Sequence, residues 1–106
     1  MAILRVAVLN DVQLEFDAHL PHALQAGLSE EKIHALRATH VDACFDELEH
    51  AVLELTDEMT RNVRVEDAVF EALRPHFETK ALVELVATVA AYSMVARFLK
   101  ALKIEH

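Results

Sequence analysis

Glycine and proline are nearly absent from this chain, which has one Gly and two Pro among its 106 residues. Proteins built from β-sheets use these residues at turns that recur about every 8 to 12 residues. Helical folds need fewer turns, so the scarcity favours an all-α fold. The length is that of a single domain, which we expect to span residues 1–106.

Cysteine is also scarce, because Cys44 is the only one in the sequence. A lone cysteine cannot form an internal disulfide, a CxxC redox pair or a cysteine-based metal cage, and it fits a reducing compartment. The first residues do not have the pattern of a secretory signal peptide. Together these absences predict a cytoplasmic location.

Basic residues are few, since 10 Lys and Arg against 18 Asp and Glu give a formal net charge of -8. No basic patch stands out in the sequence, so we expect no nucleic acid partner. The acids concentrate between Asp42 and Glu58, where no Lys or Arg occurs. We expect this segment to form a solvent-exposed face, and a docking surface for a basic partner is the alternative.

Long apolar runs are missing as well. The longest uncharged run in the C-terminal half covers residues 85–96, which is shorter than the roughly 20 residues that cross a bilayer, so we expect no membrane partner. Yet 54% of the residues are hydrophobic, more than the usual ~45 to 50%. A domain this small buries only about two thirds of its chain surface. We therefore expect a homo-oligomer in which another subunit covers part of the apolar surface.

Periodicity and capping residues predict a compact bundle of five to six helices, over residues 3–9, 12–26, 30–39, 42–61, 65–73 and 80–103. One stripe with the spacing of a helix face consists of Phe45, Leu48, Val52, Leu55 and Met59. The expected N-caps are Asn10–Asp11, Ser29 and Thr79, and the expected helix ends are Gly27 and Pro75. The last helix is apolar around most of its circumference. We expect it to be buried on several sides, in the middle of the domain and at a subunit contact.

The second helix carries the residues best suited to chemistry. On a helix that advances about 100° per residue, Glu15, His19 and His22 lie within roughly 60° of each other. A Glu–His pair at this spacing can exchange a proton near neutral pH, because imidazole is half-protonated at a pH of about 6.5. Pro21 adds to this, since it lacks an N–H and leaves the Asp17 carbonyl without its helical partner. We expect it to kink the helix within one turn of His19.

Other interpretations of these residues remain open. A Glu–His pair one turn apart is also common on helix surfaces without any function. Glu15, His19 and His22 could form a metal site, but one helix rarely supplies three ligands in tetrahedral geometry, so we expect no metal. Tyr92 is the only Tyr in the chain, and in a buried helix its hydroxyl needs a partner.

Three segments resemble the carboxymuconolactone decarboxylase family, which has the alkylhydroperoxidase D-like fold. They are RVAVLNDVQLEFDAHLPHALQAGLSEEKIHALR, FDELEHAVLELTDEMTRN and LVELVATVAAYSMVARFLKAL. The likeness spans nearly the whole chain, from the first of these segments to the last. The resemblance implies an all-α subunit that assembles into trimers or hexamers. The peroxidase branch of the family carries a CxxC, which this chain lacks, so we expect no peroxidase of that type.

The decarboxylase branch has a Glu-aromatic-x-x-His pattern, matched here by Glu15, Phe16 and His19. The resemblance implies a cofactor-free lyase or isomerase that transfers a proton on a small carboxylated lactone or a related enolisable acid. In this interpretation His19 is the acid and base and Glu15 orients it. His22 and Tyr92 donate hydrogen bonds to substrate oxygens.

Some features leave the substrate unassigned. The relatives most like this chain often have Trp at the position of Phe16, and a bulky aromatic and Asn near Ala91 and Ser93. Smaller side chains there would enlarge a cavity. An anionic substrate needs a cation, and the candidates are Arg5, Arg61, Arg64 and Arg97. The alternative function is a non-catalytic helical oligomer that binds a small ligand.

Overall fold

A computed structural model describes residues 1–38 and 44–104, and within these ranges it contains helices and no strands. The helices are α1 (Ala2–Leu9), α2 (Gln13–Gln25), α3 (Glu30–Ala35), α4 (Glu47–Asn62), α5 (Asp67–Leu73) and α6 (Thr79–Ala101). The all-α architecture predicted from the scarcity of glycine and proline is thereby confirmed.

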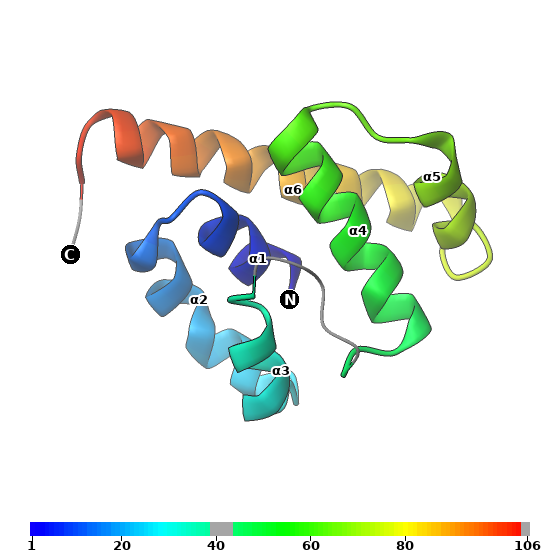
Figure 1. Ribbon diagram of the computed structural model, residues 1–106, viewed down its shortest axis with the longest axis horizontal. Coiled ribbons are helices and arrows are strands. Elements are labelled where there is room, and N and C mark those ends of the chain that lie inside the picture. Colours follow the sequence, from blue (N-terminus) through cyan, green and yellow to red (C-terminus); the bar gives the residue numbers. More distant parts are fainter. Residues whose placement is uncertain (39–43, 105–106) are drawn as a thin grey trace.

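Helix α1 lies at the centre of the bundle and packs against α2, α4 and α6 (Figure 1). The long helix α6 runs along one side of the molecule, where it contacts α1 and α4, and α5 packs against α4. Helices α2 and α3 lie together at the other side of α1 (Figure 1). This arrangement brings part of α2 near α6, although the two helices are far apart in the sequence.

The buried side chains form two clusters. The first joins α1, α2 and α3 and includes Leu4, Phe16 and Leu36, each at most 2% exposed. The second joins α4 and α5 around Leu55 and Leu73, which are fully buried. Apolar residues from the first half of α6 pack against the second cluster. Helix α2 is therefore anchored to α1 through Phe16, which fixes the rotation of its polar stripe.

Helix α4 begins later than the sequence predicted, at Glu47 instead of near residue 42. Residues 42 and 43 lie outside the described ranges. The reason for the later start is a capping box, in which Asp46 accepts from the backbone N–H of Glu49 at 2.8 Å and Glu49 accepts from that of Asp46 at 3.0 Å. Glu49 also accepts from Lys32 at 2.7 Å, and this hydrogen bond raises the pKa of the Lys32 ammonium.

The acidic segment is not simply a solvent-exposed face. Glu49 bonds to α3 as described, Asp57 is paired with a buried arginine, and Glu58 accepts from the backbone N–H of Glu66. The expected stripe is confirmed in part, because Phe45, Val52 and Leu55 are buried while Leu48 is 36% exposed. Burial also extends beyond the stripe, to Ala51, Leu53 and Thr56.

The remaining helix ends agree in part with the sequence. Ser29 caps α3 by accepting from the backbone N–H of Lys32, as predicted. Gly27 follows α2 with φ of 92°, a conformation that side chains disfavour. Asn10 ends α1, but the N-cap of α2 is Val12, without a side-chain cap. The prediction that Thr79 caps the last helix is wrong, because Glu78 holds that position and makes no side-chain cap bond.

Helix α6 is much less buried than expected. Its buried residues are Val89, Ser93 and Ala96, which form one narrow stripe against the bundle. On the other side Met94 and Phe98 are 66% and 62% exposed. By length and composition alone, α6 is the one helix of the described residues that could cross a membrane. The absence of a membrane partner stays a prediction.

Arg5 is 1% exposed and joins three parts of the fold. Its Nε and Nη2 donate to the carboxylate of Asp57 on α4 at 2.7 and 2.8 Å. Its Nη1 donates to the carbonyls of Leu36 and Ala38, in the turn that follows α3. A charge buried in this way is stabilising only when it is paired and hydrogen-bonded, and Arg5 meets both conditions.

Candidate active site

Glu15 and His19 face each other on α2, with Oε2 of Glu15 3.2 Å from Nε2 of His19. They lie one turn apart on the part of the helix surface between the buried face, which carries Phe16, and the solvent-exposed face. The side chains are 18% and 26% exposed, respectively. The pair is therefore partly shielded and still reachable from solvent, as a proton-transfer pair must be.

Two further aromatic rings surround His19. The ring of Tyr92, on α6, meets it edge-on with the centroids 5.1 Å apart and the planes at 88°. The ring of His22 lies 6.2 Å away at 44°. The structure thus brings together all four residues singled out from the sequence, Glu15, His19, His22 and Tyr92. Tyr92 comes from a distant segment, and its position beside His19 follows from how α6 packs in the fold.

Spacing alone does not distinguish this pair. His50 and Glu54 on α4 have the same separation in sequence, and their Nδ1 and Oε1 atoms are 3.4 Å apart. Their side chains are 41% and 46% exposed. The pair on α2 differs in being about half as exposed and in having Tyr92 against its imidazole.

Helix α2 continues through Pro21 without interruption, from Gln13 to Gln25.

Within the ranges 1–38 and 44–104, no three His, Cys, Asp or Glu side chains are grouped so that they could hold a metal ion. The arrangement at His19 suits proton exchange with an organic molecule: a carboxylate and an imidazole beside the edge of a phenol ring.

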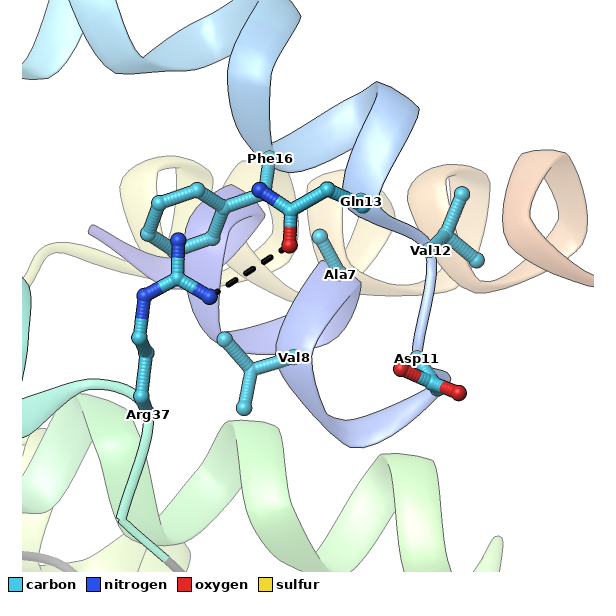
Figure 2. Close-up of a pocket in the computed structure, with 7 residues that line it drawn as sticks. All are labelled: Ala7, Val8, Asp11, Val12, Gln13, Phe16 and Arg37. Atoms are coloured by element: carbon cyan, nitrogen blue, oxygen red, sulfur yellow. Dashed lines mark hydrogen bonds between the residues drawn. The ribbon is translucent and has the colours of Figure 1, made fainter. Parts of the chain in front are cut away.

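A small cavity of about 270 Å³ lies at the start of α2, between α1 and the turn after α3 (Figure 2). Arg37 and Gln13 form polar parts of its wall, and Val8 and Phe16 form apolar parts. The guanidinium carbon of Arg37 sits 3.9 Å from the centroid of the Phe16 ring. Nη1 of Arg37 donates to Oε1 of Gln13 at 3.4 Å, the bond drawn in Figure 2.

The sequence gives no sign that Arg37 lines a cavity. Four other arginines were predicted as candidate ligands for an anionic substrate. For Arg5 this prediction is wrong, because Arg5 is buried and its guanidinium is bonded to Asp57 and to backbone carbonyls. Arg61, Arg64 and Arg97 are exposed. Arg37 carries no motif, and only the fold shows that it lies over Phe16.

Comparisons with known proteins agree with the resemblance read from the sequence. The model of the carboxymuconolactone decarboxylase family matches residues 1–58, which include Glu15, His19 and His22. A crystal structure of a protein of unknown function from Agrobacterium tumefaciens, described as a candidate antioxidant defence protein AhpD, superposes with a TM-score of 0.88. It shares 25% sequence identity, over 99% of this chain and 73% of its own. No curated protein matches the sequence.

Proposed function

Because the chain belongs to the carboxymuconolactone decarboxylase family, we propose that it is a cofactor-free lyase or isomerase acting on a small carboxylated lactone or a related enolisable acid. The observation that carries the proposal is the shielded Glu15–His19 pair with Tyr92 against it. General acid–base chemistry of this kind requires a proton carrier and an orienting group within reach of the substrate.

In the proposed reaction the bond between the substrate carbon and its carboxylate breaks. Carbon dioxide leaves, and the electron pair passes through the unsaturated lactone to its carbonyl as an enolate. Protonated His19 then delivers one proton to the enolate carbon next to that carbonyl, so a carboxylate and a proton become a C–H bond and carbon dioxide. With Nε2 of His19 facing Glu15, the other ring nitrogen, Nδ1, is the one that would transfer the proton.

The neighbouring residues have supporting roles in this proposal. Glu15 holds the ring in place, through the contact between its Oε2 and Nε2 of His19. His22 and the hydroxyl of Tyr92 would donate hydrogen bonds to the enolate oxygen, where negative charge develops. Such donors lower the barrier because they are already oriented before the reaction begins.

A peroxidase that cycles through an internal disulfide is a different chemistry, and it needs two cysteines. The 106 residues hold only Cys44, so that cycle cannot run within this chain. The description of the Agrobacterium protein as an antioxidant defence protein therefore does not transfer to these residues as a two-cysteine mechanism.

The test is to incubate the protein with carboxymuconolactone in D2O, measure carbon dioxide release, and follow the product by NMR. We expect release above the buffer rate and one deuterium on the product carbon next to the lactone carbonyl. Exchange of deuterium into related enolisable acids without carbon dioxide release would indicate the isomerase form of the reaction. If neither carbon dioxide release nor deuterium exchange exceeds the buffer rate, the proposal is contradicted.

A further inference from the structure

The cavity at the start of α2 has a cation held in place on one wall. Arg37 lies in the turn after α3, and the carbonyls on either side of it, those of Leu36 and Ala38, both accept hydrogen bonds from buried Arg5. The backbone that carries Arg37 is thus tied to α1 and, through Asp57, to α4. Such ties reduce the freedom that the side chain would lose when it binds a ligand.

The guanidinium itself is also oriented. It stacks over the face of Phe16, 3.9 Å from the ring centroid, and Phe16 is only 2% exposed. Stacking on a fixed aromatic ring is favourable and leaves the edges of the guanidinium open to a planar anion. Within the described residues Arg37 donates one hydrogen bond, to Gln13 at 3.4 Å, of the five that a guanidinium can donate.

The rest of the cavity favours a small molecule with an apolar body. Val8 and Val12 line it beside Phe16. The carboxylate of Asp11 also lines it, but on the opposite side from the guanidinium (Figure 2). The Asp11 side chain is 98% exposed and lies 3.8 Å from Lys100, so its charge is partly offset. The nearby Asp17 carboxylate accepts from Nε2 of Gln13 at 2.7 Å.

We propose that this cavity is a binding site for a small planar carboxylate, with the anion on the guanidinium edge of Arg37 and the apolar body against Phe16 and Val8. A carboxylate fits because its two oxygens match the fork of a guanidinium. The volume of about 270 Å³ holds a single ring with its carboxylate. The site lies at the start of the helix that carries Glu15 and His19, and its existence does not depend on the proposed activity.

The test uses sodium benzoate as the probe and two-dimensional ¹H–¹⁵N NMR of the full chain. We expect saturable shifts confined to the amides of residues that line the cavity, among them Gln13, Phe16 and Arg37. Benzamide has the same shape without the charge, and we expect it to bind at least about tenfold more weakly. Shifts of equal size with benzamide would overturn the proposal.

Arg37→Met is the decisive variant, because methionine keeps an apolar chain over Phe16 and removes only the guanidinium. We expect it to weaken benzoate binding by at least about tenfold, with an otherwise unchanged spectrum. Arg74→Met is the matched control, since Arg74 is 66% exposed and does not line the cavity, and it should bind benzoate as the wild type does. Unchanged affinity in Arg37→Met, an equal loss in Arg74→Met, or no saturable shift in the wild type would each contradict the site.

Discussion

At the scale of single residues, two Glu–His pairs one turn apart are in contact but lie in different environments, Glu15–His19 and His50–Glu54. His19 is shielded by the fold and touched by Tyr92, whereas His50 lies on the open surface of α4. Burial strengthens electrostatic interactions, because water no longer screens them. The environment of a pair, and not its spacing, therefore decides which one is suited to chemistry.

Arg5 is the residue whose loss should damage the fold most. Arg5→Met removes the guanidinium and leaves Asp57, 13% exposed, without the cation that it faces. Breaking a buried ion pair by removing one partner costs about 3 to 5 kcal/mol of unfolding free energy. Urea unfolding followed by circular dichroism would measure this loss.

A double variant distinguishes two causes of the stability loss in Arg5→Met, an unpaired buried charge and a packing defect. If the unpaired carboxylate causes the loss, Arg5→Met combined with Asp57→Leu should recover part of the stability that Arg5→Met loses. Arg64→Met, at an exposed site, should change the stability by less than about 0.5 kcal/mol. A double variant as unstable as the sum of both single variants would contradict this explanation.

At the scale of elements, the helices differ in whether a side chain accepts hydrogen bonds from the backbone N–H groups of the first turn. Helix α4 starts with a complete capping box at Asp46 and Glu49, whereas Glu78 at the start of α6 makes no side-chain cap bond. A cap satisfies backbone N–H groups that have no partner within the helix. The shorter α4 thus depends on its cap, and α6 does not.

Asp46→Ala should lower the unfolding free energy by about 1 kcal/mol, the usual value of an N-cap. Glu78→Ala occupies the same position on α6 but removes no cap bond, so we expect a change of less than about 0.5 kcal/mol. Thermal and urea unfolding of the two variants would compare them. Equal losses in both would show that the box at Asp46 contributes nothing specific.

Local signals in the sequence account for much of the secondary structure. They account for few of the side-chain contacts that join the helices to one another. The order of the six helices, the end of α2 at Gly27 and the cap at Ser29 follow from propensity and capping, which depend on neighbouring residues. The Arg5–Asp57 pair links residues 52 positions apart, and no local pattern marks it. The same holds for Tyr92 beside His19 and for Arg37 over Phe16. These contacts depend on how the helices pack, so they required the structure.

At the scale of the whole molecule, α6 has an apolar face that no other part of the described residues covers. Val83, Met94 and Phe98 are each more than 60% exposed, and large exposed apolar patches mark interaction sites. We propose that a second copy of the chain covers it, in the homo-oligomer expected from the composition. A helix apolar on both sides is explained if one side packs on the bundle and the other on a neighbouring subunit.

Size-exclusion chromatography with light scattering tests this assembly. We expect the wild type to have three or six times the chain mass of 11.9 kDa. Met94→Lys and Phe98→Lys should shift it toward the monomer, because a charge is costly to bury at an interface. Val63→Lys, at an apolar residue that is 79% exposed and lies outside α6, should leave the mass unchanged. A monomeric wild type at micromolar concentration would contradict the proposal.

In the proposed cofactor-free reaction, His19 carries the proton and Glu15 orients it. The most direct measurement is the rate of carbon dioxide release from carboxymuconolactone by His19→Ala and by His50→Ala, which removes the equivalent histidine of the exposed pair. We predict that His19→Ala lowers kcat by a factor of about 10² to 10⁴, the usual contribution of a general acid or base, while His50→Ala keeps the wild-type rate. Equal rates in the two variants would show that His19 does not carry the proton.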